Sequence, residues 1–421
     1  MKKVFLYLLC LLLLVLRYFA SENYFQNIVW SNKDLIDLQK INGYVKELVS
    51  YSPAEVKFLV GSTAWQGNIF ISKVNTQPLE VGQVVELTAN KFQLWTDIQP
   101  GSFKNYLRLK KVWLELKNPA IKVSRNEVLL WSSYQSGLRK TLNEYLLQHF
   151  SADGAGLLAG TMFGDTSLLS PSTKNNFKIA GLSHLMAVSG ANMTMISQLI
   201  FKILFFLHLR KRVIITIPFL LIFTLFVGAN AAVLRAFLMA IISLWGTFLG
   251  KPYLAIRALA LTVILIFIYD PSIVLYDIGF QLSSAATFGL LFSVKFFERC
   301  LNFIPWKSFQ DTCCITLAAT LFTSPLLLFY FSSMSLLAPL INVLLTPLLS
   351  LLSIGGYLFL SISFIPGINS IVFFTTDLIL HFLLALVAIS AYFANQYIIN
   401  LVPSSFSIAI FYFVLIILMR R

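Results

Sequence analysis

Charged side chains are scarce in this sequence, and their scarcity limits the kind of protein that it encodes. Only 12% of the 421 residues are charged and 57% are hydrophobic, whereas soluble domains carry about 25% charged residues. This imbalance excludes an ordinary soluble protein and favours a protein embedded in a membrane. Residues 21–150 hold most of the acidic side chains, and long segments after residue 150 are almost uncharged. We therefore expect one aqueous region and one membrane-embedded region.

Cysteine is equally scarce, and its spacing carries no metal or redox signature. The four cysteines lie in or beside apolar segments and form no CxxC pair: Cys10, Cys300, Cys313 and Cys314. The histidines form no HxHxDH metal motif, and no GxxxxGK[ST] loop is present to hold a nucleotide. We expect no disulfide framework, no metal site and no cofactor.

Long apolar segments are what the sequence has in abundance. The first follows Lys2-Lys3 and fills residues 1–20, where either a signal peptide or a membrane anchor fits. Tyr18-Phe19-Ala20 is a poor cleavage site, which favours an uncleaved anchor. The later apolar segments are residues 190–209, 213–229, 231–249, 254–269, 279–296, 312–330, 335–361, 367–394 and 404–419.

The net charge of +14 has three physical explanations: contact with anionic lipid, topology signals or a polyanionic partner. Lysine and arginine gather in the cytoplasmic loops of membrane proteins. Ten crossings would place all of the main basic clusters in the cytoplasm: Lys2-Lys3, Arg210-Lys211-Arg212, Lys251 with Arg257, Arg299 with Lys307, and Arg420-Arg421. The sequence thus predicts a polytopic α-helical membrane protein with about 10 transmembrane helices and both termini in the cytoplasm.

Residues 21–127 form the predicted aqueous domain, which this topology places outside the cytoplasm. INGYVKEL, VKFLV, GNIFISKV and VGQVVELTANKF have the composition of short strands separated by Gly, Pro and Asn. LRLKKVWLELKNPAIKV extends the pattern. We expect a small β-barrel here.

Residues 128–189 connect this domain to a transmembrane domain at residues 190–421. The connecting segment combines the amphipathic LLWSSYQSGLRKTLNEYLLQHF with the glycine-rich GAGLLAGTMFGD, and neither is a clean spanning run. Surface-lying or re-entrant helices fit this segment.

A few ionisable groups interrupt the apolar segments, where each charge is costly unless it faces a cavity or a partner. His184 is either a helix-packing residue or a pore-lining residue. Arg235 either snorkels to the membrane interface or offers positive charge to an aqueous cavity. Asp277 is either an N-terminal helix charge or part of a polar stripe with Gln281.

Other polar and helix-breaking residues lie deeper in the apolar sequence. Asp377 and His381 are four residues apart on one helix face, a spacing that predicts a local pair. Pro325, Pro339 and Pro347 indicate broken or kinked helices around a cavity.

Five motif blocks occur between residues 157 and 350: LLAGTMFGD, IAGLSHLMAVSGANMTMI, VLRAFLMAII, DPSIVLYDIGFQLSSAATFGLL and TLFTSPLLLFYFSSMSLLAPLINVLLTPLL. In content and order they resemble the ComEC competence-protein family. INGYV, PLEVGQVVEL and FKNYLRLKKVWLELKNP resemble the OB-type extracytoplasmic domain of that family. The resemblance implies that single-stranded DNA crosses a bacterial cytoplasmic membrane through this protein during natural transformation.

DNA phosphates need a water-filled route with polar or positive walls, because their charge is not screened inside hydrocarbon. Our candidate channel-lining residues are His184, Ser189, Asn192, Arg235, Asp277, Gln281 and Asn342. OB-type barrels bind single strands by basic grooves and aromatic stacking. Residues of this kind occur together at Lys104, Tyr106, Arg108, Lys110, Lys111 and Trp113, which either bind DNA or belong to an ordinary solvated strand.

Two departures from the family pattern bear on function. Many members have a second His where this chain has Asn192, so a role that needs a His pair is not expected. Many relatives continue into a metallo-β-lactamase-like domain, whereas this chain stops at Arg421. We therefore expect no enzymatic activity, including nuclease activity. The implied partners are single-stranded DNA, membrane lipids, an extracytoplasmic DNA receptor, a separate nuclease and a cytoplasmic ATPase motor.

Two other functions stay open. An intramembrane serine hydrolase would use Ser189 and a His, but Ala187 stands two residues before Ser189, where rhomboid-like proteases have Gly. His184 and Ser189 would also point about 140° apart on one helix. A transporter of another anionic polymer or solute would explain the membrane bundle and not the barrel.

Overall fold

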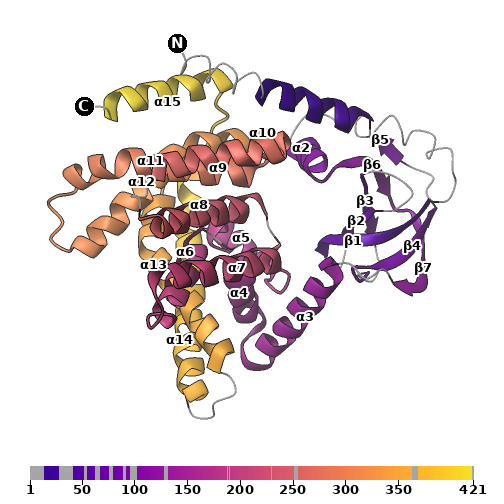
Figure 1. The fold of residues 1–421 in the computed structure, drawn as a ribbon, viewed down its shortest axis with the longest axis horizontal. Helices are drawn as coiled ribbons and strands as arrows, with labels where there is room; N and C mark the ends of the chain where they lie inside the picture. The colour runs from indigo at the N-terminus through magenta and orange to yellow at the C-terminus, as the bar shows by residue number, and fades with distance from the viewer. Residues whose placement is uncertain are drawn as a thin grey trace. The chain divides into compact units, whose positions relative to one another are not determined.

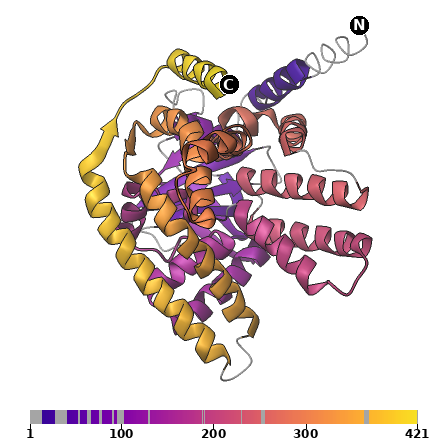
Figure 2. The ribbon, with the colours of Figure 1, turned by 90° about the vertical axis from the view of Figure 1, so that its left-hand side faces the viewer.

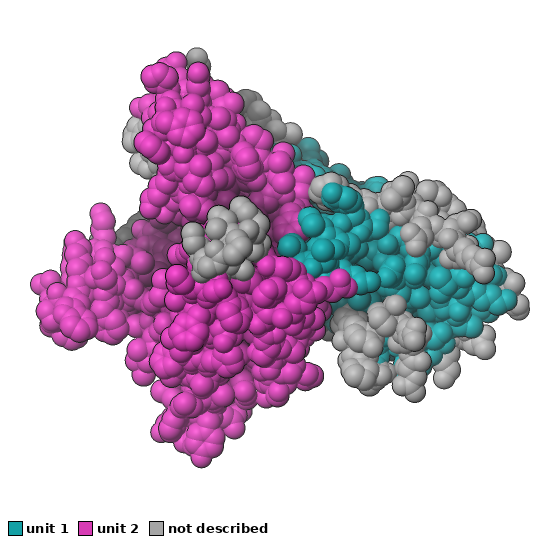
Figure 3. Space-filling view, turned by 90° about the horizontal axis from the view of Figure 1, so that it is seen from below, with its two compact units in different colours: residues 1–142, 264–277 teal, residues 143–263, 278–421 magenta. Residues whose placement is uncertain are grey.

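A computed structural model describes most of the chain. The described residues are 14–27, 41–51, 55–61, 67–74, 79–88, 92–94, 102–127, 131–186, 188, 190–228, 230–250, 255–362 and 368–419. Ser189 and most of the predicted N-terminal anchor lie outside them. The chain divides into two compact units, coloured separately in Figure 3. Unit 1 contains residues 1–142 and 264–277, and unit 2 contains residues 143–263 and 278–421.

Unit 1 is built on a seven-stranded sheet (Figure 1). Its strands are β1 (Ile41–Tyr51), β2 (Glu55–Gly61), β3 (Asn68–Val74), β4 (Gln83–Thr88), β5 (Phe92–Leu94), β6 (Val112–Lys117) and β7 (Ala120–Glu127). The order is β5-β6-β3-β2-β1-β4-β7, with β3 and β6 parallel and the other neighbours antiparallel. The strands predicted at INGYVKEL, VKFLV, GNIFISKV and VGQVVELT are confirmed as β1 to β4.

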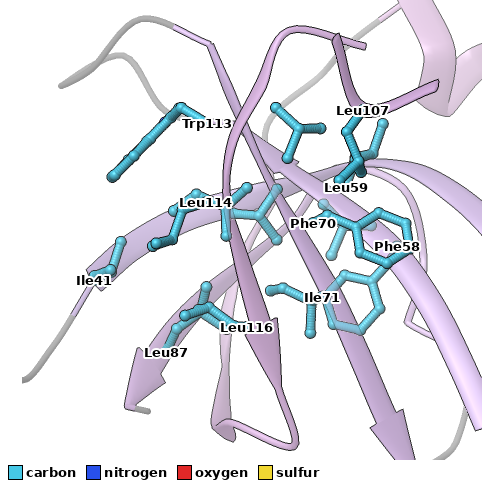
Figure 4. Close-up of a cluster of buried hydrophobic side chains, with 14 of the residues drawn as sticks. Ile41, Phe58, Leu59, Phe70, Ile71, Leu87, Leu107, Trp113, Leu114 and Leu116 are labelled. Atoms are coloured by element: carbon cyan, nitrogen blue, oxygen red, sulfur yellow. The ribbon is translucent and has the colours of Figure 1, made fainter. Parts of the chain in front are cut away.

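The core of unit 1 is a cluster of apolar side chains from most of these strands (Figure 4). Phe58, Ile71, Leu87 and Trp113 are each at most 1% exposed. Full burial of a large apolar side chain stabilises a fold by about 1.5–3 kcal/mol. β1 pairs with both β2 and β4 and is bulged along its β2 edge, and bulges bend a strand. The bent first strand therefore helps the sheet to enclose this core.

A helix stands where the sequence predicted continuation of the barrel strands. α2 (Ser102–Leu109) includes the start of LRLKKVWLELKNPAIKV, and β6 begins only at Val112. Helical spacing turns Phe103 toward Phe70, with ring centroids 5.6 Å apart, and buries Leu107 in the core. Lys111 then adopts a left-handed conformation at φ 52°, which separates the helix from the strand. The strand prediction was wrong here because the apolar spacing at residues 103, 106 and 107 is helical.

Unit 2 is helical and holds most of the long apolar helices. They are α6 (Gly190–Ile203), α7 (Leu209–Val227), α8 (Ala231–Phe248), α11 (Ile278–Cys300), α12 (Lys307–Phe331), α13 (Ala338–Ile362), α14 (Ile368–Ala394) and α15 (Ser405–Met419), and α9 (Ala255–Tyr269) runs from unit 2 into unit 1. Five described helices are long and apolar enough to cross a membrane: α8, α11, α12, α13 and the span Ser370–Tyr397 that contains most of α14. Figure 2 shows α14 as one long helix that leads toward α15. This apolar helical content is that of a membrane protein.

The other predicted crossings are shorter or begin with charged residues in the part of the chain that the structure describes. α6 has 14 residues, and α9 and α15 have 15 each. A helix of 15 residues spans about 22 Å, less than the roughly 30 Å of a hydrocarbon core. α7 has 19 residues but opens with Leu209-Arg210-Lys211-Arg212. Among the described residues there are five spans of full length and several other apolar helices, and the total of ten crossings stays a prediction.

A small antiparallel sheet joins two distant connections in unit 2. β8 (Ser333–Ser335) pairs with β9 (Ile398–Asn400), and Ser335 Oγ donates to the Ala394 carbonyl at 3.2 Å. The apolar segment predicted at residues 335–361 thus begins as a strand, and its helix starts at Ala338. Pro339 lies in the first turn of that helix, where its missing N–H is harmless. Pro325 and Pro347 lie inside α12 and α13.

Three helices and a 3-10 turn fill the segment before α6. They are α3 (Trp131–His149), α4 (Ala152–Phe163), α5 (Pro171–Ile179) and the 3-10 turn η3 (Ser183–Leu185). Residues 154–163 of α4 are all buried, so a surface-lying position is wrong for this helix. Its glycines explain the burial. A Cβ at Gly156 would lie 2.7 Å from the Leu169 nitrogen, and one at Gly160 would lie 2.6 Å from the Met186 carbonyl oxygen.

Two glycine substitutions test whether α4 is packed this closely. Gly160→Ala should destabilise the protein by about 1–3 kcal/mol, because the added methyl group meets backbone that must shift. Gly137→Ala in α3 is the matched control, since its Cβ would meet nothing within 4 Å and alanine favours a helix by up to about 1 kcal/mol. Thermal unfolding of the detergent-purified proteins measures both. Equal melting temperatures for the two variants would contradict the close packing.

Candidate functional site

The last turn of α4 ends inside unit 2, where its carbonyl groups need partners because a helix leaves its last four unbonded. Gly164, left-handed at φ 81°, donates its N–H to the Gly160 oxygen at 3.0 Å. Asn192 Nδ2 of α6 donates to the Thr161 oxygen at 2.5 Å. Tyr357 Oη of α13 donates to the Met162 oxygen at 2.8 Å. Three of the last four carbonyls of α4 are therefore satisfied by donors from three segments of the chain.

Two carboxylates hold the segments on either side of α4. Asp165 accepts hydrogen bonds from Asn143 Nδ2 at 2.8 Å and from the Ser167 N–H at 2.9 Å. Asp153 accepts bonds from the N–H of Ser170 at 2.7 Å and from Thr173 Oγ1 at 2.8 Å. Burial opposes ionisation of Asp153, but the hydrogen bonds outweigh it and lower the pKa of this carboxyl. Asp153 is thus ionised at neutral pH and anchors the start of α5.

Arg235 lies on α8 and reaches across to α11. Its side chain is buried, at 6% exposure. Nε and Nη2 donate to Ser283 Oγ at 3.1 and 2.5 Å, and Nη1 donates to Thr287 Oγ1 at 2.6 Å. Snorkelling would carry the guanidinium out to the interface, so that explanation is wrong for Arg235. Its hydroxyl partners are neutral: they orient the positive charge and do not neutralise it.

A second polar contact joins α11 to α12. Tyr330 Oη donates to Gln281 Oε1 at 2.6 Å. The same two helices also approach each other closely at a second point, where a Cβ at Gly289 of α11 would lie 2.7 Å from the Ala318 carbonyl oxygen of α12. α11 therefore carries polar connections to both α8 and α12, and the predicted stripe that includes Gln281 is partly engaged in them.

The motif blocks of the sequence contact one another in space. A Cβ at Gly181, which has φ 74°, would lie 2.5 Å from the Ala338 Cβ, and one at Gly190 would lie 3.8 Å from Arg235 Nη2. The contacts of Gly160 with Met186 and of Asn192 with Thr161 link two further blocks. We refer to the hydrogen-bonded side chains and the carbonyls that they reach as the motif network: Thr161, Met162, Asn192, Arg235, Gln281, Ser283, Thr287, Tyr330 and Tyr357.

Two more candidate lining residues lie in unit 2 outside this network. The His184 side chain is exposed, yet desolvation by nearby protein lowers the pKa of its imidazole. The lowered pKa keeps this imidazole neutral at neutral pH. Asn342, on α13, is 9% exposed, and its Oδ1 accepts no hydrogen bond from any residue that the structure describes.

Four predicted residues of the membrane segments remain: Ser189, Asp277, Asp377 and His381. Ser189 lies outside the described residues, so its candidate roles stay predictions. Asp277 belongs to unit 1 and ends α10 (Pro271–Tyr276), directly before α11 begins. The local pair of Asp377 and His381 is confirmed, with Oδ2 and Nδ1 3.3 Å apart.

The six predicted DNA-binding residues all lie in unit 1, and the structure separates them. Trp113 is 0% exposed in the core, so a role in base stacking is wrong for it. Arg108 is buried and ion-paired with Glu22, and Lys110 Nζ lies 2.7 Å from a carboxylate oxygen of Glu47.

The other three residues of that group are more accessible. Tyr106 is half-buried against the core, and burial raises its pKa, so its hydroxyl stays protonated. Lys104 is half-buried on α2, and Lys111 is exposed on the turn that follows. These two lysines are the members of the group best placed to meet a polyanion.

Comparison with known proteins assigns the family. The family model described as Competence protein matches residues 161–421, and the chain belongs to that family. The chain is also similar to ComE operon protein 3 of Bacillus subtilis (strain 168), at 27% identity over 232 residues. That match covers 54% of this chain and 29% of the relative, so the chain corresponds to a minor part of that protein. No solved structure matches. The matched region begins at Thr161 and contains the whole motif network.

Several network residues were not singled out from the sequence. Thr287, Tyr330 and Tyr357 stand in apolar helices, where a hydroxyl by itself does not indicate a partner. The neighbouring Gly355-Gly356 was the available signal for Tyr357. A Cβ at Gly356 would lie 2.5 Å from Met162 Sδ, so this glycine lets α13 approach α4 closely enough for the tyrosine to reach the Met162 carbonyl.

Removal of one hydroxyl tests the hydrogen bonding at the end of α4. Tyr357→Phe should destabilise the protein by about 1–3 kcal/mol, because it leaves a buried carbonyl without its donor and changes little in volume. Tyr392→Phe on α14 is the control, since Tyr392 is 70% exposed. The measurement is thermal unfolding in detergent. If both variants melt like the unmodified protein, the Met162 carbonyl does not depend on Tyr357.

Proposed function

We propose that this protein forms the route by which single-stranded DNA crosses the bacterial cytoplasmic membrane during natural transformation. Family membership supports a role in competence and DNA uptake. The channel itself is the finer claim, and one observation carries it: a buried arginine is held by hydroxyl groups between two helices of the membrane unit.

The electrostatics of Arg235 favour an anionic permeant. A cation inside a membrane protein costs several kcal/mol of desolvation, so it is usually retained for a purpose. Ser283 and Thr287, four residues apart on α11, fix the position of the guanidinium by hydrogen bonds, and hydroxyl groups carry no charge of their own. A positive wall in a water-filled route lowers the barrier for each phosphate that passes.

The other lining residues are proposed with different roles. His184 offers an exposed imidazole, Asn342 offers a buried amide oxygen, and Gln281 lies on the same helix as the arginine partners. Asn192 donates to the Thr161 carbonyl, so we propose that it positions α4 and does not face the permeant. Ser189 and Asp277 stay candidates on the sequence alone.

Two sets of contacts support the proposed multi-pass topology. In unit 2, pairing of β8 with β9 brings together the connections that follow α12 and α14, which ten crossings would leave on one side. In unit 1, Arg17 donates to the Ile268 and Tyr269 carbonyls at 2.8 and 2.7 Å. The helix at residues 14–27 therefore contacts the end of α9, which agrees with a shared outer side for these two segments. The proposal keeps both termini cytoplasmic and the sheet domain outside.

We further propose that the sheet of unit 1 is an OB-type domain that meets DNA outside the membrane. A long first strand paired on both edges and an open seven-stranded order support this assignment, since the OB fold is a partly open Greek-key barrel. Lys104, on α2, is the proposed contact. An extracytoplasmic DNA receptor, a separate nuclease and a cytoplasmic ATPase motor would supply capture, strand removal and energy.

Neutralising Arg235 tests the charge-based account. Arg235→Gln keeps a hydrogen-bond donor near Ser283 and removes the charge, and it should reduce uptake by roughly tenfold or more because the phosphates lose a positive wall. Arg235→Lys should retain an intermediate level. The readout is labelled DNA that becomes resistant to external DNase, normalised to the abundance of the protein in membranes.

Arg257→Gln is the control, because Arg257 is exposed on α9 and loses the same charge. Wild-type uptake by Arg235→Gln at normal abundance would contradict a role for this charge in permeation. Equal loss of uptake in Arg257→Gln and Arg235→Gln would also contradict it.

A further inference from the structure

Unit 1 contains a small basic pocket, whereas the motif network belongs to unit 2. Its volume is about 360 Å³, and its polar lining includes Arg17, Ser21, Arg108, Lys111, Asp270 and Ser272. These residues come from the helix at residues 14–27, from α2 and the turn after it, and from the junction of α9 with α10. Segments distant in the sequence therefore combine to form it.

The cations of the pocket are held in fixed positions. Arg17 donates to two carbonyl groups at the end of α9. Arg108 is 7% exposed, is ion-paired with Glu22 and lies 4.7 Å from the centroid of the Tyr276 ring. Lys111 is half-exposed, with Nζ 4.0 Å from Asp270 Oδ2. Three positive and two negative groups leave one net positive charge at the pocket, which suits a singly charged anion.

The position of the pocket along its helices indicates what kind of anion it meets. The helix at residues 14–27 exposes Val15, Leu16 and Phe19, and the end of α9 exposes Leu265 and Ile268. In a membrane protein such exposed apolar side chains face lipid. The pocket lies at the end of these apolar stretches, and its aromatic walls include Tyr24 and Tyr269, which are 49% and 73% exposed. Exposed tyrosines of this kind mark the depth of lipid headgroups.

We propose that this pocket binds the headgroup of an anionic phospholipid. Arg17, Arg108 and Lys111 surround the phosphodiester, which carries one negative charge. Ser21, Ser272 and Asp270 supply hydrogen-bonding groups for the hydroxyls of a glycerol headgroup. A bound lipid links the first helix to α9 and α2, and so fastens the sheet of unit 1 to the membrane surface. The proposal depends on membrane insertion and is independent of DNA passage.

A nucleic acid strand fits this pocket less well than a headgroup does. Single-strand sites of OB-type domains extend over about 4 or more nucleotides along a groove, whereas this pocket has the volume of one headgroup. The position of the pocket at the end of apolar stretches also favours a lipid headgroup over a nucleic acid strand. DNA binding at the pocket is therefore an outcome that the test must distinguish.

Native mass spectrometry of the full chain, released from nanodiscs of equal phosphatidylglycerol and phosphatidylcholine, tests the proposal. The unmodified protein should retain one phosphatidylglycerol in preference to phosphatidylcholine. Lys111→Asn should reduce the retained fraction about fivefold, the effect of one basic residue at a membrane surface. Asn tolerates the left-handed conformation of this position, so the fold is expected to persist. Lys111→Arg should retain the lipid.

The control is Lys117→Gln, which removes one exposed charge of β6 away from the pocket. Equal retention of phosphatidylglycerol and phosphatidylcholine, or equal losses in Lys111→Asn and Lys117→Gln, would overturn the proposal. Displacement of the lipid by inorganic phosphate would reassign the pocket to free anions. If Lys111→Asn weakens oligonucleotide binding and leaves lipid retention unchanged, the pocket is reassigned to DNA.

Discussion

A helix that ends inside apolar protein must find donors for its last carbonyl groups. The packing of unit 2 depends on how α4 meets this requirement. Gly164 turns the chain back and donates its own N–H, Asn192 donates from α6, and Tyr357 donates from α13. Each unmet buried group would cost about 1–3 kcal/mol. The three donors come from distant parts of the sequence, so the ending of one short helix fixes the positions of two long ones.

The same unit also keeps a buried cation, which is the link from structure to function. Arg235 lies beside Gly190 at the start of α6. The same helix carries Asn192, which contacts α4. Ser283 and Thr287 hold it from α11, and Tyr330 joins α11 to α12 through Gln281. The hydrogen bond from Asn192 to Thr161 thus connects α6 to α4, α6 contacts α8, and α8 presents the charge that we propose for DNA phosphates.

The sequence predicted structure correctly where the pattern involves only residues close together in the chain. Alternating and turn-bounded segments predicted β1 to β4, apolar runs predicted the five full-length spans, and a four-residue spacing predicted the Asp377–His381 pair. It was insufficient where partners are distant. Pairing of β8 with β9, burial of α4 and the donor role of Tyr357 depend on contacts between segments far apart. Trp113 and Arg108 were read as accessible because a residue type shows chemistry and does not show which way the side chain faces.

The central claim is that single-stranded DNA enters the cell through this protein, and the most direct test is transformation of a deletion strain with labelled DNA. The account predicts that DNA binds to the surface of these cells and does not become resistant to external DNase, and that the intact gene restores resistance. Normal accumulation of DNase-resistant DNA in the deletion strain would contradict it.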